Sequence, residues 1–432
     1  MITTSRVSSW LNHGLTAHHP RLAAIRLSPR LDLQEFSGGL GDIGVMVPIM
    51  ATLIVHNGFN ATSLLLVFGL TYVATGVYYR VPVPVQPLKA MAAIAIAQGL
   101  GADAVCAGAI VMGVLLLALA ATGLIKPLTT LFSHGVIRGI QLAVGLLLLR
   151  AALKLSLSDS IVRDGGDAAF QLGSTTVPVA LVIAAALLPV MLIAATRRTV
   201  PVMLALLPPS IVAGALISFP GVSGSDIGPQ TPDVGVPSLG MMLSALTLLV
   251  IPQLPLTLGN AVIASEDTAR GYYGEKAKRV TQRALLTSTG LANLFAGAIG
   301  GMPVCHGSGG FTAHRTFGAR TGLSTVAFGA FLLVLGLGFA GGVTAVFGMI
   351  PLPVLGALLF LVAAQHALLV RDLRGAGWAV AGATGIVAFF TSNVGYGFAA
   401  GIALDLTLRR CPRLGASSPA KLPALPLDAE AA

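Results

Sequence analysis

Charged residues are scarce in this sequence of 432 residues. Only 10% of the residues are Asp, Glu, Lys or Arg, whereas 55% are hydrophobic and the mean hydropathy is +0.86. About a quarter of the residues of a soluble globular protein are charged, because its surface must face water. The composition therefore excludes a soluble protein and predicts a chain whose solvent is the lipid bilayer.

Cysteine is also rare, with three residues in the whole chain. Cys106, Cys305 and Cys411 are far apart and have no metal-ligand spacing, which argues against a disulfide framework and against a zinc site. We expect neither a metal nor a cofactor. Residues 1–35 lack the apolar core that a signal peptide needs, so we expect a cytoplasmic N-terminal tail.

Apolar runs divide the rest of the chain into fourteen candidate membrane segments, seven in each half. Most approach the roughly 20 residues that cross a bilayer, but the third and the tenth have only about 13 and cannot span alone. The runs lie at about 36–56, 62–80, 87–99, 104–124, 132–153, 176–195 and 200–218, and at about 241–265, 281–300, 306–318, 322–347, 351–370, 374–391 and 393–410.

The basic residues indicate the orientation of these segments, because Lys and Arg accumulate on the cytoplasmic side. If the chain starts inside, every one of the 26 basic residues falls on that side except Lys89 and three external ones, Arg150, Lys154 and Arg163. This pattern accounts for the net charge of +10 without nucleic acid. It predicts a multi-pass protein of the plasma (inner) membrane with both termini cytoplasmic.

An odd number of segments in each half makes the second half start on the opposite face of the membrane. We therefore predict an all-α membrane protein built from two inverted repeats, an organisation found in many secondary transporters. The boundaries are residues 36–218 for the first repeat, 219–240 for an external loop, 241–410 for the second repeat and 411–432 for a cytoplasmic tail.

The two short runs occupy the third position of each half and share a local pattern. Pro84-Val85-Gln86-Pro87 opens one and Pro303-Val304-Cys305-His306 opens the other. Proline holds the preceding residue extended and is a good first residue of a helix, so each motif predicts an extended segment followed by a half helix. Gln86 is a candidate substrate ligand at the first of these starts.

The start of the tenth run is rich in small residues that let an anion approach the backbone. The free N–H groups of a helix start, with the helix dipole behind them, bind anions. Glycines that only allow close helix packing are the alternative explanation. The matching short run in the other half favours a substrate site formed by His306, Gly307, Ser308 and Gly309.

Two charged residues are predicted to lie within the membrane. Lys89 follows the start of the third run, where an intramembrane cation indicates function, although its side chain could instead reach an interface. Asp42 is the one acid of the first run. It could pair with Lys89, hold a coupling cation, carry a proton or cap a helix.

The eighth run contains two prolines, Pro252 and Pro255, which we expect to disrupt the helix in its middle. Its polar residues recur at spacings of four and three and therefore share one face. A polar stripe on an apolar helix predicts a lining of the site, with interhelical hydrogen bonding as the alternative. The stripe consists of Gln253, Thr257 and Asn260.

Five motifs in this order resemble the molybdate transporter family related to the SulP sulfate permeases, over residues 33 to 410. The resemblance implies molybdate uptake by a secondary transporter with a seven-plus-seven fold, a core domain that moves against a gate domain, and no STAS domain. The motifs are Gly41-Asp42-Ile43-Gly44, Pro84 to Lys89, Pro252 to Thr257, Pro303 to Gly310, and Phe317 to Gly322.

Several alternatives stay open at this point. A sulfate transporter or an anion channel would use the same cradle, because sulfate and molybdate are both tetrahedral dianions. An intramembrane hydrolase would need Cys305, His306, Ser308 and His314 within mutual reach, and we do not expect an enzyme. Symport with a proton or a sodium ion and a homodimer formed through the gate are further expectations.

Overall fold

Helices account for most of the described chain in the computed structural model. The structure describes residues 33–125, 133–156, 169–172, 175–178, 210–212, 215, 227–231, 235 and 237–410. The N-terminal tail up to residue 32, the C-terminal tail at 411–432, most of the predicted runs 176–195 and 200–218, and most of the predicted loop 219–240 lie outside these residues.

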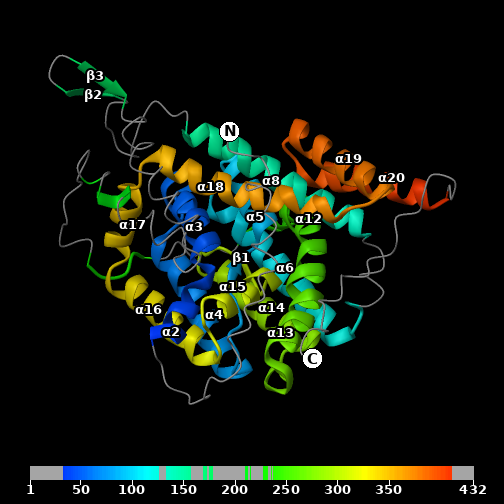
Figure 1. Ribbon diagram of the computed structural model, residues 1–432, viewed down its shortest axis with the longest axis horizontal. Coiled ribbons are helices and arrows are strands. Elements are labelled where there is room, and N and C mark those ends of the chain that lie inside the picture. The colour runs from blue at the N-terminus through cyan, green and yellow to red at the C-terminus, as the bar shows by residue number, and fades with distance from the viewer. Residues whose placement is uncertain are drawn as a thin grey trace, which may run out of the picture. The chain divides into compact units, whose positions relative to one another are not determined.

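The first five predicted runs form helices that follow their predicted bounds closely (Figure 1). The first run is a helix that contains a short 3-10 turn at Leu40–Asp42, and the third run is the short helix α5. These elements are α2 (Leu33–Gly39), η1 (Leu40–Asp42), α3 (Ile43–Asn57), α4 (Ala61–Tyr79), β1 (Gln86–Pro87), α5 (Lys89–Gln98), α6 (Ala102–Thr122) and α8 (His134–Ser156).

The second half of the chain contains a longer series of described helices. These elements are α11 (Leu239–Ala245), η3 (Leu246–Val250), α12 (Ile251–Leu256), η4 (Thr257–Ile263), α13 (Ala264–Tyr273), η5 (Gly274–Ala277), α14 (Gln282–Ala298), β4 (Val304–Cys305), α15 (Ser308–Thr316), α16 (Gly322–Gly338), α17 (Ala340–Gly348), α18 (Leu352–Ala367), η6 (Leu368–Asp372), α19 (Ala376–Thr391) and α20 (Val394–Arg410).

Three predictions need correction. The run 322–347 is broken at Phe339 into α16 and α17. The predicted run 176–195 does not start as a helix, because β3 (Thr175–Pro178) pairs antiparallel with β2 (Ala169–Leu172). The fold is therefore mostly helical with short strands. Among the described residues, four helices are long and apolar enough to cross a bilayer, Ala61–Tyr79, Ala102–Thr122, His134–Ser156 and Leu239–Ala277.

The third correction concerns the prolines of the eighth run. The helix continues unbroken from Leu239 to Ala277, because two π-helical stretches, η3 and η4, flank the segment that contains Pro252 and Pro255. A π-helical turn widens the helix and relieves the clash between a proline ring and the preceding turn. The prolines therefore change the local pitch and leave the helix intact.

Close glycine contacts join helices from different halves of the chain. α4 packs along α16 and α6 packs along α14. A Cβ atom at Gly76 would lie 2.5 Å from the carbonyl oxygen of Gly322, and one at Gly113 would lie 2.8 Å from the carbonyl oxygen of Gly290. Only glycine permits this approach, so both helix pairs depend on small residues.

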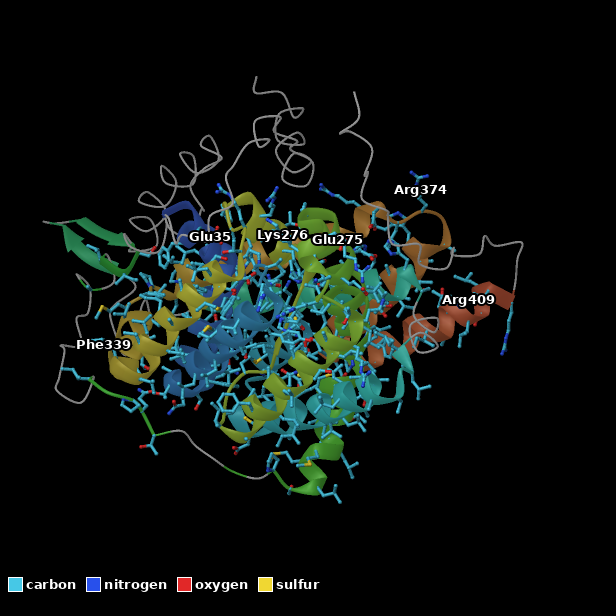
Figure 2. All side chains as sticks on the ribbon, turned by 90° about the horizontal axis from the view of Figure 1, so that it is seen from below. Glu35, Glu275, Lys276, Phe339, Arg374 and Arg409 are labelled. Carbon is cyan, nitrogen blue, oxygen red and sulfur yellow. The ribbon has the colours of Figure 1, made fainter. Side chains whose placement is uncertain are left out.

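A second group of helices packs around α8, which contacts α18, α19 and α20. On α8, Arg138 donates hydrogen bonds to Asp372 of η6, and His134 lies 3.2 Å from the same carboxylate. Burial alone raises the pKa of Asp372, but these two neighbours lower it below its ordinary value. Arg374 follows Asp372 by two residues, and Figure 2 shows it on the same side of the fold as Lys276.

Replacing Gly76 with Ala should destabilise the α4–α16 contact, because the new methyl group would overlap the backbone of Gly322. Overpacking of this kind costs about 1–3 kcal/mol. We expect a lower thermal midpoint for the purified protein in detergent. Gly382→Ala on α19 is the matched control, because a Cβ atom there meets nothing within 4 Å. Equal midpoints for both variants would contradict the packing argument.

Candidate functional site

The two extended segments meet as an antiparallel pair near the middle of the fold, as Figure 1 shows for β1 and α15. Gln86 pairs with Cys305 and Pro87 with Val304, and the amide of Leu88 donates to the carbonyl of Pro303 at 2.9 Å. Each strand runs directly into a short helix, α5 or α15. The predicted extended segments and half helices are therefore present, and their pairing brings the two helix starts together.

The start of α5 is capped from the eighth segment. Gln253 Oε1 accepts hydrogen bonds from the amides of Ala90 and Met91 at 2.8 and 3.3 Å, and Gln253 Nε2 donates to Thr257 Oγ1 at 3.1 Å. Both polar side chains are buried. These two amides of α5 are therefore not available to a ligand, because Gln253 already accepts their hydrogen bonds.

The start of α15 is more open. Ser308 and Gly309 are its first residues, and no described residue accepts a hydrogen bond from either amide. The Ser308 hydroxyl donates to Asn260 Oδ1 at 2.6 Å. A Cβ atom at Gly309 would meet nothing within 4 Å, whereas one at Gly310 would lie 2.7 Å from Asp42 Oδ1. Gly309 therefore has open space on its side-chain side, next to two amides without an acceptor among the described residues, and Gly310 is the tightly packed position.

Lys89 is the first residue of α5 and is half-buried. Within the described chain its side chain makes no hydrogen bond and no ion pair, and the predicted alternative of a pair with Asp42 is wrong. The cation and the free amides of α15 belong to the two helix starts that β1 and β4 join. An unpaired cation at such a place favours an anion as its partner.

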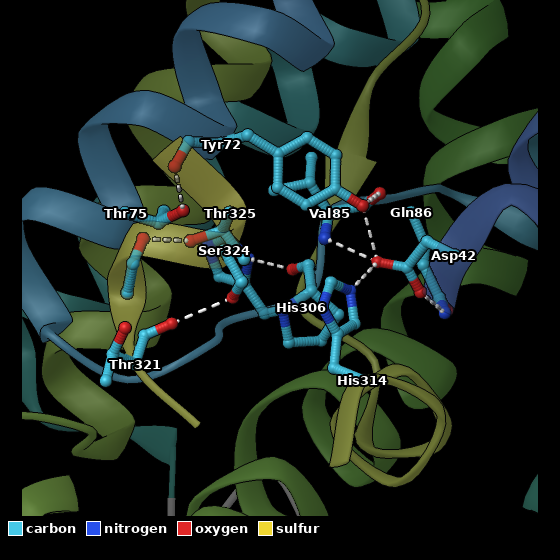
Figure 3. Close-up of polar contacts among 12 residues, drawn as sticks. Asp42, Tyr72, Thr75, Val85, Gln86, His306, His314, Thr321, Ser324 and Thr325 are labelled. Carbon is cyan, nitrogen blue, oxygen red and sulfur yellow. Dashed lines mark hydrogen bonds and ion pairs between the residues drawn. The ribbon is translucent and has the colours of Figure 1, made fainter. Parts of the chain in front are cut away.

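Asp42 is completely buried and accepts four hydrogen bonds (Figure 3). Oδ2 accepts from Tyr72 Oη at 2.5 Å, from His314 Nε2 at 2.9 Å and from the amide of Val85 at 3.1 Å, while Oδ1 accepts from Gln86 Nε2 at 2.5 Å. A buried carboxylate is tolerated only with such partners. Sequence reasoning missed Tyr72 and the role of His314, and an intramembrane histidine was the one available signal.

His306 is fully buried. Its Nδ1 lies 2.8 Å from the carbonyl oxygen of Pro84, which can only accept, so Nδ1 carries the hydrogen. Nε2 then accepts from Ser288 Oγ at 2.8 Å, and Tyr79 Oη lies 2.8 Å from the same Ser288 oxygen. Through these hydrogen bonds the His306 ring links the paired segments at β1 and β4 to α14 and α4.

The hydrolase alternative finds no support in this geometry. Ser308 bonds Asn260, His306 bonds Ser288 and His314 bonds Asp42, so neither histidine is hydrogen-bonded to Ser308, the hydroxyl that this alternative requires. Among the described residues, no group of three or more His, Cys, Asp and Glu side chains could hold a metal ion.

Comparison with known sequences gives one consistent result. The family described as "Molybdate transporter of MFS superfamily" matches residues 34–148 and 245–365. Molybdate transporter 2 of Arabidopsis thaliana is 28% identical over 409 residues, which cover 87% of this chain and 87% of that protein. Molybdate transporter 1 of Chlamydomonas reinhardtii is also 28% identical, covering 86% of this chain and 91% of its own length.

Solved structures show the same fold at low sequence identity. The transmembrane domain of a cyanobacterium bicarbonate transporter, BicA, superposes with a TM-score of 0.59 at 18% identity, covering 85% of this chain and 96% of that domain. Murine Solute Carrier 26 family member A9, an anion transporter in the inward-facing state, gives 0.59 at 16% identity, covering 95% of this chain and 72% of that one.

Replacing Lys89 with Met removes the cation and keeps the length of the side chain. A charge-assisted hydrogen bond contributes about 1.5–3 kcal/mol, so the affinity for a tetrahedral dianion such as molybdate should fall roughly ten- to hundredfold. Binding to the purified protein can be measured by calorimetry. Lys154→Met, at the end of α8, is the control. Unchanged affinity in a folded Lys89→Met protein would place the cation outside the site.

Proposed function

Because the chain belongs to the family of molybdate transporters of the MFS superfamily, we propose that it takes up molybdate across the plasma membrane. The protein is an integral membrane anion transporter, since both its molybdate transporter relatives and its structural neighbours are transporters. The substrate follows from the relatives together with the chemistry of the site, which offers donors and a cation for a tetrahedral oxyanion.

The start of α15 is the observation that carries this proposal. The free amides of Ser308 and Gly309 lie at the positive end of the helix dipole, and there is open space beside Gly309. The Ser308 hydroxyl donates a hydrogen bond to Asn260 Oδ1. Asn260 Nδ2 then lies close to Gly307 as a further donor. Together with Lys89, these groups form a cradle in which an oxyanion meets several donors at once.

The remaining predicted ligands support the cradle in this proposal. Gln253 and Thr257 hold the start of α5, and His306 holds the crossing of the strands. The hydrogen bond between Gln86 and Asp42 joins β1 to the first segment. A carboxylate that contacted the anion directly would repel it, so Asp42 acts through its neighbours.

Two groups of helices support a mechanism of alternating access. We assign α4, α6, α14 and α16, which pack together, to a core, and α8, α18, α19 and α20, which also pack together, to a gate. The α4–α16 and α6–α14 pairs exchange under an inverted seven-plus-seven repeat, which supports that organisation. We propose an elevator movement of the core against the gate, driven by symport with a proton or a sodium ion, in a homodimer whose termini are cytoplasmic.

Uptake into proteoliposomes tests the substrate. We expect saturable uptake of molybdate and tungstate, measured by mass spectrometry, with sulfate as a weaker competitor. The backbone cradle accepts any tetrahedral dianion, so the relative rates decide the preference. Sulfate uptake without molybdate uptake would make the protein a sulfate transporter, and flux that rises linearly with concentration would make it a channel.

Replacing Gly309 with Val tests the position of the cradle. The fold has room for this side chain, but its branched carbons would occupy the space in front of the Ser308 and Gly309 amides. Uptake should collapse while the thermal midpoint stays close to that of the unmodified protein. Ser308→Ala should be milder, because the amides remain. Gly382→Val is the control for bulk added to an open glycine, and normal uptake by Gly309→Val would move the cradle elsewhere.

A further inference from the structure

The two oxygens of the Asp42 carboxylate have different surroundings. Oδ2 accepts three hydrogen bonds, from the Tyr72 hydroxyl, the His314 imidazole and the Val85 amide. Within the described part of the chain Oδ1 accepts only one, from Gln86 Nε2 at 2.5 Å. Three donors fill the space around Oδ2 and leave no place for a proton there. Oδ1 has a single partner, and that partner is an amide group that can reverse its role.

The other end of the same amide group is unsatisfied. Gln86 Oε1 is buried and makes no hydrogen bond in the described part of the chain. It points towards the first residue before α15, because a Cβ atom at Gly307 would lie 2.8 Å from it. An oxygen acceptor in that place would repel an anion bound at the start of α15. A buried acceptor without a donor also destabilises the folded protein by about 1–3 kcal/mol.

We propose that Gln86 couples a proton to the anion by rotating its side-chain amide. When Asp42 takes up a proton on Oδ1, its new O–H group donates to Gln86 Oε1, and Gln86 Nε2 then turns towards the start of α15. The inference rests on the proposed function, since the ligand is the anion held by Ser308 and Gly309. It assigns the proton as the coupling ion.

The chemistry of this step balances without any further reactant. The proton arrives from water on the side where the anion enters, binds an oxygen lone pair and breaks no covalent bond. It returns to water on the other side when the anion leaves. In the protonated state the buried acceptor of Gln86 gains a donor and the cradle gains an N–H group. Proton and anion therefore strengthen each other's binding, and this coupling is reciprocal.

The groups that surround Asp42 fit this assignment. Tyr72 on α4 and His314 on α15 donate to Oδ2, while Lys89, Cys305 and His306 act on the carboxylate from a greater distance. From α2, Glu35 faces the amide of Thr321, and on α15 Arg315 lies over the Tyr273 ring.

His314 is the rival position for the proton. Its Nε2 already donates to Asp42, and its Nδ1 is buried and has no partner among the described residues. A proton at Nδ1 would create a buried donor that nothing accepts, and Gln86 would keep its present orientation. The two positions therefore predict different effects of changing Gln86.

Calorimetric titration of the purified full-length protein with molybdate tests the proposal. Titrations in buffers of different ionisation enthalpy give the number of protons taken up with each anion. We expect one proton, and a Kd that rises by about tenfold for each pH unit once Asp42 is ionised in the free protein. Infrared difference spectra should show the carbonyl stretch of a protonated carboxyl group on binding, which Asp42→Asn abolishes.

Gln86→Leu separates the switch from a merely structural role. At low pH the variant lacks the extra N–H donor, so its affinity should fall by about tenfold or more. At high pH it also lacks the unfavourable acceptor, so its affinity should equal or exceed that of the unmodified protein. Gln141→Leu, a buried glutamine on α8, is the matched control and should keep the full pH dependence. His314→Gln keeps an N–H donor and should keep the proton uptake.

Three outcomes would overturn the proposal. Molybdate binding without proton uptake would exclude the coupling while leaving the transport function intact, whereas absence of molybdate binding to the unmodified protein would remove the function itself. If Gln86→Leu lowered the molybdate affinity equally at low and high pH, Gln86 would have a structural role only. Loss of proton uptake in His314→Gln, with the protein folded, would place the proton on the imidazole. Thermal midpoints show whether Gln86→Leu folds. If it does not, proton uptake measured on Asp42→Asn tests the proposal instead.

Discussion

The fold depends on satisfying the backbone where two helices are interrupted inside the membrane. Lipid offers no hydrogen bonds, so non-helical backbone at this depth must find partners within the protein. The extended segments before α5 and α15 solve this by pairing with each other, Gln86 with Cys305 and Pro87 with Val304. Pairing two interruptions from opposite halves of the chain brings their helix starts together, and a concentration of donors results.

The two helix starts then differ in what they offer a ligand. Gln253 reaches from the eighth segment and satisfies two amides of α5, whereas the amides of Ser308 and Gly309 at α15 stay free. The same helix that presents free donors at its start carries His314 near its end, where it holds Asp42. The nine residues of α15 therefore include both the free amides and the histidine that bonds the buried carboxylate.

Sequence reasoning succeeded for features that depend on local pattern. Apolar runs gave most helices within a few residues, and paired proline motifs gave the extended segments before α5 and α15. It failed to predict changes within helices. Pro252 and Pro255 lie between two π-helical stretches of a continuous helix, and the apolar run 322–347 is interrupted at Phe339. Hydrophobicity measures solvent preference and contains little information about helix pitch.

The sequence by itself determined that the chain lies in a membrane and that two proline-containing extended segments each precede a short helix. Only the tertiary structure decided which polar groups remain available. Asp42 could have faced Lys89, but it faces Tyr72, Val85, Gln86 and His314. The reason is physical: a hydrogen bond depends on atoms within about 3 Å of each other, and residues from distant segments reach that distance only after the helices have packed.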